Sequence, residues 1–277
     1  MNSTMLPQRW ILPAAVILLT LGLGACQRVV SIDLNKADPH IVIEGVVTDG
    51  PGPYTVSITK TGSYFEPSLV FPTVSGATVV LRDNAGTIDT LREAAPGKYV
   101  SSRLSGVEGR TYQLSVVAEG KEYDGTSVMP QKIRIDSVYT TVLRAPDGDR
   151  GYNIFVKFKD PPTQENYYRV IVHTNMMPPD SITGQRYLLV SDKLLNGNEA
   201  TYQIRASRNI DPGDTLTVAL FSVDRATYEY YSTLRNILSF DRSPTALAPA
   251  NPNTNLSNGS LGYFAALTAD SVHIVLR

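Results

Sequence analysis

Cysteine is almost absent from this chain of 277 residues: Cys26 is the only one. A single thiol cannot form an intrachain disulfide, and thiolate zinc sites need several Cys or His ligands at close spacing. Histidine is scarce too, because His40, His173 and His273 are the only three and lie far apart in the sequence. No His-x-x-x-His pair occurs, so we predict neither a metal site nor a cofactor.

The chain also lacks a strong net charge. Its formal net charge is −1, from 25 Lys and Arg against 26 Asp and Glu, and no basic cluster occurs. Proteins that bind nucleic acid usually carry a basic patch, so nucleic acid is not an expected partner. After Cys26 no apolar run reaches 18 residues, so no helix beyond that point is expected to cross a bilayer.

The N-terminus carries the pattern of an export signal. A polar start over residues 1–9 is followed by an apolar stretch of 14 residues, 11–24. That length is below the roughly 18–20 residues that a membrane-spanning helix needs. It fits the hydrophobic region of a secretory signal, so we predict a signal peptide over residues 1–25.

The end of this signal resembles the bacterial lipobox, in which a cysteine becomes the lipidated first residue of the mature protein. The motif consists of Leu23, Gly24, Ala25 and Cys26. We therefore predict lipid on Cys26, followed by a tether over residues 26–37; the alternative is a plain signal peptide with a chance cysteine. Each buried CH₂ contributes about 0.8 kcal/mol, so several acyl chains would anchor the chain permanently. We expect the lipid to attach the protein to the outer membrane of the cell envelope, on either its periplasmic or its surface face.

The rest of the chain reads as mainly β. Gly (20), Pro (18) and Tyr (15) are frequent, and short alternating segments are separated by turn residues, which is typical of sandwiches and barrels. We predict two antiparallel β-sandwich units, Ig-like or carboxypeptidase-regulatory-like. The first covers residues 38–130 and the second residues 131–277. Glu44 lies inside an otherwise apolar strand, and we expect it to face an edge.

One segment of the second unit breaks the β pattern. Residues 225–240 contain no Gly or Pro, and Tyr230, Leu234 and Ile237 recur at helical spacing, which predicts a short amphipathic helix packed on the sandwich. The following residues, 241–259, are rich in Pro and Asn. A connection of that length is usually a binding loop or disordered.

The helix and the loop are the surface that we nominate for binding, because loops on rigid scaffolds commonly carry function. The nominated residues are Tyr228, Tyr231, Asn251, Asn253 and Asn255. For the tyrosines the alternative is packing against the sandwich.

No catalytic constellation is recognisable. Residues 258–262 approach the Gly-x-Ser-x-Gly elbow, but Asn258 occupies the first glycine position and no strand–turn–helix of an α/β sheet is expected there. Asp147 and Asp149 flank Gly148 without the further ligands of a calcium loop. A glycan hydrolase would need two carboxylates facing each other across a cleft, and the sequence cannot pair them. We predict a protein that is not an enzyme.

Taken in order, the motifs of the mature chain resemble those of the lipoprotein family known as domain of unknown function 4249, typical of Bacteroidetes. They include Ile43-Glu44-Gly45, Gly97-Lys98-Tyr99, Met129-Pro130, Asp160-Pro161-Pro162, Gly213-Asp214-Thr215 and Leu261-Gly262-Tyr263-Phe264. The family has no established activity and supplies no site residues.

The resemblance implies a cell-envelope lipoprotein, because such members are often encoded beside TonB-dependent outer-membrane transporters. The leading hypothesis is a non-enzymatic accessory or binding module of such a transporter, whose small-molecule or glycan ligand stays unidentified. The alternative is a structural or adhesive spacer protein without a specific ligand.

Overall fold

The computed structural model describes residues 38–62, 70–144, 150–162, 164–174, 186–194, 196–205, 212–240 and 251–276. The lipobox residues Leu23, Gly24, Ala25 and Cys26, the tether, and residues 241–250 of the predicted loop lie outside these described residues. Within the described parts, no helix is long and apolar enough to span a bilayer.

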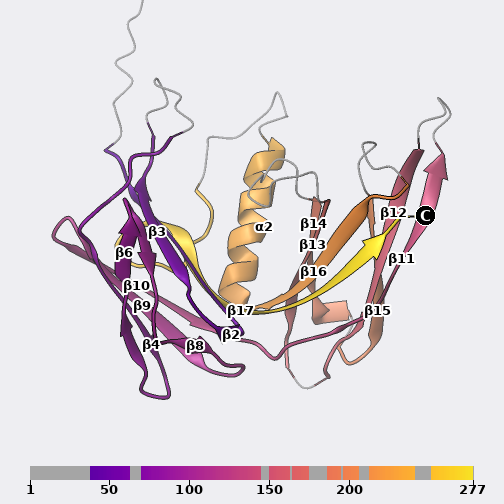
Figure 1. Cartoon of the computed structure of the whole chain (residues 1–277), viewed down its shortest axis with the longest axis horizontal. Helices are drawn as coiled ribbons and strands as arrows, with labels where there is room; N and C mark the ends of the chain where they lie inside the picture. The colour runs from indigo at the N-terminus through magenta and orange to yellow at the C-terminus, as the bar shows by residue number, and fades with distance from the viewer. Residues whose placement is uncertain are drawn as a thin grey trace, which may run out of the picture. The chain divides into compact units, whose positions relative to one another are not determined.

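The fold is mainly β, as the sequence predicts (Figure 1). The strands of the N-terminal part are β1 (Ile41–Thr48), β2 (Gly50–Pro51), β3 (Thr55–Lys60), β4 (Thr78–Asp83), β5 (Ile88–Thr90), β6 (Arg92–Ala95), β7 (Lys98–Val100), β8 (Ser105–Gly106), β9 (Thr111–Ala118) and β10 (Lys121–Val128). The elements that follow are β11 (Ile135–Arg144), β12 (Arg150–Lys159), β13 (Tyr167–Thr174), β14 (Arg186–Ser191), the 3-10 helix η2 (Asp192–Leu194), β15 (Glu199–Arg205), β16 (Thr215–Val223), α2 (Arg225–Phe240) and β17 (Leu261–Val275). The helix α2 occupies the residues predicted for it.

A large sheet runs through the described part of the chain in the order β14-β13-β16-β17-β1-β3-β7-β6. The 15-residue strand β17 joins its two halves. The first half of β17 pairs in parallel with β1, and the second half pairs antiparallel with β16. The parallel pair is an exception to the antiparallel arrangement that we predicted.

Two smaller sheets, β10-β9-β4-β5 and β11-β12-β15, cover one face of the large sheet. Phe264 and Ala266 of β17 point into the core beneath the four-stranded sheet, and Leu276, just beyond β17, lies in the core beneath the three-stranded sheet. Tyr263 and Leu267 point to the opposite face, where they pack with Tyr228 of α2. Alternation along a strand therefore places the two cores on one face and the helix on the other.

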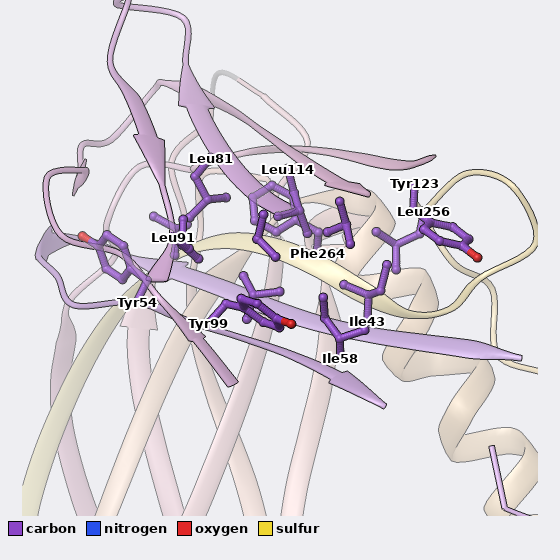
Figure 2. Close-up of a cluster of buried hydrophobic side chains, with 14 of the residues drawn as sticks. Ile43, Tyr54, Ile58, Leu81, Leu91, Tyr99, Leu114, Tyr123, Leu256 and Phe264 are labelled. Atoms are coloured by element: carbon purple, nitrogen blue, oxygen red, sulfur yellow. The ribbon is translucent and has the colours of Figure 1, made fainter. Parts of the chain in front are cut away.

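The first core is made by alternating residues of facing strands (Figure 2). Ile43 and Ile58 of the large sheet face Leu81 and Leu114 of the four-stranded sheet, and each is at most 1% exposed. Buried tyrosines need a partner for the hydroxyl. Tyr99 satisfies this need because its hydroxyl donates to the carbonyl of Val74 at 2.9 Å.

The second core lies between β12 and the strands β13 and β16. Tyr152, Ile154, Val156 and Phe158 alternate along β12 and are buried against Val170, Val218 and Leu220. The ring of Phe158 meets that of Tyr168 edge to face, with centroids 4.9 Å apart.

The predicted boundary at residue 130 does not describe how the C-terminal segment packs. We assigned residues 131–277 to the second sandwich, but Leu256, Phe264 and Ala266 lie in the first core. The reason is the length of β17: its first half completes the first sandwich before its second half enters the other. Residues 39–277 accordingly form one compact unit.

Candidate functional site

The nominated surface is built around α2, whose start is set by one carboxylate. Asp224 follows β16 directly, and its Oδ1 atom accepts the N–H of Thr227 at 2.9 Å, which is the contact of a helix N-cap. Its Oδ2 atom accepts the hydroxyl of Ser127 at 2.6 Å and the N–H of Val128 at 3.2 Å. The same side chain thus begins the helix and holds the end of β10.

The tyrosines of α2 pack on the outer face of the large sheet. The ring of Tyr228 lies 4.9 Å from that of Tyr167, and the ring of Tyr230 lies 4.6 Å from that of Tyr263, both measured between centroids. The hydroxyl of Tyr231 donates a hydrogen bond of 2.7 Å to the hydroxyl of Tyr263. These contacts make a cluster of aromatic rings between the helix and the sheet.

The side chain of Arg169 on β13 contacts two rings of this cluster. Its guanidinium carbon lies 3.8 Å from the ring centroid of Tyr231 and 5.3 Å from that of Tyr187, both within cation–π range. Its Nε atom is buried without a hydrogen-bond partner among the described residues. The stacking on two rings therefore offsets part of the cost of placing this cation beneath the helix.

Glu44 supplies a negative charge at the other side of the cluster. It stands opposite Tyr263 on β1, between β3 and β17, and so lies on the sheet surface and not at a sheet edge as predicted. Its side chain keeps contact with solvent, but the surrounding atoms exclude enough water to raise its pKa. Glu44 is thus an exposed carboxylate that stands next to the aromatic cluster.

The cluster also changes the acidity of its tyrosines. Burial raises the pKa of Tyr230 and of Tyr263, and the nearby charge of Glu44 acts in the same direction on both. Burial also raises the pKa of Tyr167 to about 12. These hydroxyls therefore stay protonated at neutral pH and are poorly suited to act as bases or nucleophiles.

The described end of the loop is tied to β10 and to the helix. Asn255 donates to the carbonyls of Phe264 (2.7 Å) and Thr126 (3.0 Å) and accepts the N–H of Phe264 at 3.0 Å. Leu256 forms a β-bridge with Gly125. The N–H of Asn253 donates to the hydroxyl of Thr233 on α2 at 3.0 Å. This part of the loop has a fixed course.

The nominated residues therefore divide into two groups. Asn251 and Asn253 are exposed and available to a partner. Tyr231 is buried at 9% exposure, and Asn255 uses both ends of its amide within the fold, so neither serves as a surface contact. Tyr228 is half-buried against Tyr167, which corresponds to the packing alternative.

Sequence reasoning missed Arg169 and the role of Glu44 beneath the helix. Arg169 alternates with apolar neighbours on β13, and this pattern alone reads as a residue of a solvated strand face. Only the placement of α2 over this face converts both residues into parts of one cluster.

Two buried acids, Asp160 and Asp192, lie elsewhere in the fold. Asp160 accepts the hydroxyl of Tyr168 and the N–H of Gly197 (2.9 Å), and Asp192 accepts the N–H of Asn166 (2.8 Å). A hollow of about 260 Å³ lies beside Asp192, lined also by Glu165 and Lys193. Both acids are bound to backbone groups that close loops, so their role here is structural. Among the described residues, no group of three or more His, Cys, Asp or Glu side chains could hold a metal ion.

Comparison with solved structures finds only weak likenesses. A cytokine receptor complex is 12% identical over 84% of this chain and 95% of that chain, with a TM-score of 0.25. A segment of two fibronectin type-III domains from chicken tenascin is 16% identical over 67% of this chain and 91% of that chain, with a TM-score of 0.20. At these values the likenesses carry no argument about function.

Comparison with curated proteins finds no match. Comparison with family models finds one that covers residues 27–272, under the description "Domain of unknown function (DUF4249)". The order of motifs in the sequence pointed to the same family. The chain belongs to the DUF4249 family.

Proposed function

We propose that this protein is a non-enzymatic binding module, anchored to the outer membrane by lipid on Cys26, that acts as an accessory of a TonB-dependent transporter. The anchor and the transporter rest on the lipobox and on the family resemblance. The contact surface proposed for the partner is the exposed strip that consists of Asn251, Asn253 and the outward side of α2.

The observation that carries this proposal is the fixed course of the loop beside the helix. Asn255 and Leu256 attach the loop to β10, and Asn253 attaches it to α2. Asn253 is thus displayed at a set position on a rigid scaffold, with Asn251 two residues before it, which reduces the entropy that binding must offset. Amide side chains that both donate and accept hydrogen bonds suit a polar protein rim or a hydroxyl-rich ligand.

The first experiment is purification of the tagged, lipidated protein from its own host in mild detergent, followed by mass spectrometry. A stoichiometric transporter is the expected companion. A protein that stays alone after gentle crosslinking would contradict the accessory role and favour the spacer alternative.

The contact strip is tested with the double variant Asn251→Ala and Asn253→Ala. The exposed side chains of both residues can be removed without breaking a hydrogen bond described for them, since Asn253 uses its backbone N–H. The matched control is Gln113→Ala with Thr126→Ala, a pair of exposed, cross-strand residues on β9 and β10. We expect copurification of the transporter to fall only in the asparagine variant; equal recovery in both would reject this strip.

A further inference from the structure

The strand β11 leaves one of its edges open. It is the outer strand of the sheet β11-β12-β15 and pairs with β12 from Ser137 to Arg144. On the side away from β12, among the described residues, only Ile135 has a hydrogen-bond partner for its backbone, the Oδ2 atom of Asp270 at 2.8 Å. A row of free N–H and C=O groups is a template for pairing with a further strand.

Two other edge strands carry features that discourage such pairing, whereas β11 does not. Edge strand β6 holds Arg92 and Glu93 within four residues and has a register shift. Edge strand β10 is charged and partly covered by Leu256. By contrast, residues 137–143 of β11 contain no charged residue, Pro or Gly.

The open edge also exposes large side chains. Tyr139 is 48% exposed and Val142 is 49% exposed. Tyr139 stacks on Phe155 of β12 with centroids 4.8 Å apart and planes 8° apart, so one ring face is covered and the other is open. Uncharged, partly apolar residues of this kind are typical of a strand with neighbours on both sides, although β11 lies at the edge of its sheet.

The sequence of β11 is complementary to itself in one register. Directly opposite residues of antiparallel strands place their side chains on the same face, so two copies must pair at positions whose numbers sum to an even value. With Thr140 opposite Thr140, Val138 falls opposite Val142 and Tyr139 opposite Thr141. The comparison is confined to residues 137–143, because the β-bulge at Asp136 interrupts the regular alternation of the strand.

The two neighbouring even registers both lose the valine match. With Thr141 opposite itself, Val142 falls opposite Thr140, and with Tyr139 opposite itself, Val138 falls opposite Thr140. The match of Val138 with Val142 in the first register occurs twice, once on each side of the axis, as expected of an isologous interface.

We propose that two copies of this chain associate by antiparallel pairing of β11 with β11 about a twofold axis at Thr140. The pairing joins the two three-stranded sheets into one continuous sheet. It covers Val142 with Val138 of the second copy, and the free N–H and C=O groups of the two strands form hydrogen bonds with each other. This inference is independent of the proposed transporter contact.

The register is tested by disulfide formation in the full-length chain. The variant Thr140→Cys places one cysteine on the axis, directly opposite its copy, where cross-strand Cβ atoms approach to about 4.5–5.5 Å; a disulfide needs about 3.5–4.5 Å, so a small adjustment suffices. We expect a reducible dimer after mild oxidation. In the matched variant Thr141→Cys the cysteine lies opposite Tyr139 and should form no disulfide between the two copies, and the parent chain measures any background from Cys26.

A second measurement uses the mass of the full-length chain by sedimentation velocity in density-matched detergent. Val142→Lys places a charge on the open edge and should convert the dimer to monomer. Val117→Lys is the control, because Val117 is 44% exposed on the interior strand β9, and it should stay dimeric like the parent. A monomeric parent, a dimeric Val142→Lys variant, or stronger crosslinking of Thr141→Cys than of Thr140→Cys would overturn the proposal.

Discussion

Ser127 donates a hydrogen bond of 2.6 Å to Asp224, although 97 positions separate the two residues. The same serine oxygen accepts the N–H of Ala266 at 2.8 Å. Through these two hydrogen bonds, the side chain of Ser127 joins the end of β10, the start of α2 and the middle of β17. The surface proposed for binding depends on this junction, because it sets where the helix begins relative to the sheet.

Replacement of Asp224 by Ala should therefore lower stability more than loss of a cap alone. The change removes the N-cap, which is worth about 1 kcal/mol, and leaves the buried hydroxyl of Ser127 without its acceptor, which costs about 1–3 kcal/mol. Asp224→Asn keeps a good cap and should fall between the variant and the parent. Urea unfolding measures the difference, with Glu229→Ala on the exposed side of α2 as the control; equal effects of Asp224→Ala and Glu229→Ala would contradict the junction.

Gly262 should tolerate no side chain, because it lies where β17 approaches β1. Its φ is +91°, and an added Cβ would collide with the carbonyl oxygen of Ile43. Gly259 is the matched control: its φ is +71°, but an added Cβ would meet open space. We expect Gly259→Ala to cost about 1–2 kcal/mol from backbone conformation and Gly262→Ala clearly more. Thermal unfolding of both variants measures these losses of stability. Equal losses would mean that the backbone of β17 at Gly262 does not approach Ile43 of β1 as closely as described.

Asp89 should make stability fall in acid. Burial opposes its ionisation, but the N–H groups of Arg103, Leu104 and Ser102 donate to it and together hold its pKa below 3.8. A depressed folded-state pKa contributes stability that is present above the unfolded pKa and is lost as the pH falls through the folded pKa. Asp89→Asn should cost about 2 kcal/mol near pH 7 and flatten the decline below about pH 4. Unfolding curves measured from pH 7 to pH 3 test this, and parallel curves for parent and variant would refute it.

Glu44 should change the pH dependence of stability in the opposite direction from Asp89. Because desolvation raises its folded-state pKa above 4.5, ionisation disfavours the fold, and stability declines as the pH rises from 4.5 through the folded pKa. Glu44→Gln should therefore raise the melting temperature at pH 7 and leave it nearly unchanged at pH 4. A variant that is less stable than the parent at pH 7 would show that the carboxylate has a stabilising partner.

The sequence by itself determined the local structure of this protein. Absence of Gly and Pro with helical spacing of Tyr230 and Leu234 set the bounds of α2 correctly. The strands β1 and β9 fall where the short apolar segments bounded by turn residues predict them, and buried and more exposed side chains alternate along both. These features depend on residues within one turn of helix or a few positions of strand, where periodicity carries the information.

Tertiary structure alone decided which strands share a core and which nominated residues stay exposed. The apolar residues of β17 indicate which side chains are buried but not against which strands, so they do not say that Phe264 enters one core and Ile274 packs against the other. An amide such as Asn255 reads as a surface residue until Thr126 and Phe264, distant in sequence, take both of its ends. Strand pairing and side-chain hydrogen bonds of this kind join residues far apart in the chain, and their partners are chosen by the packing of the whole fold.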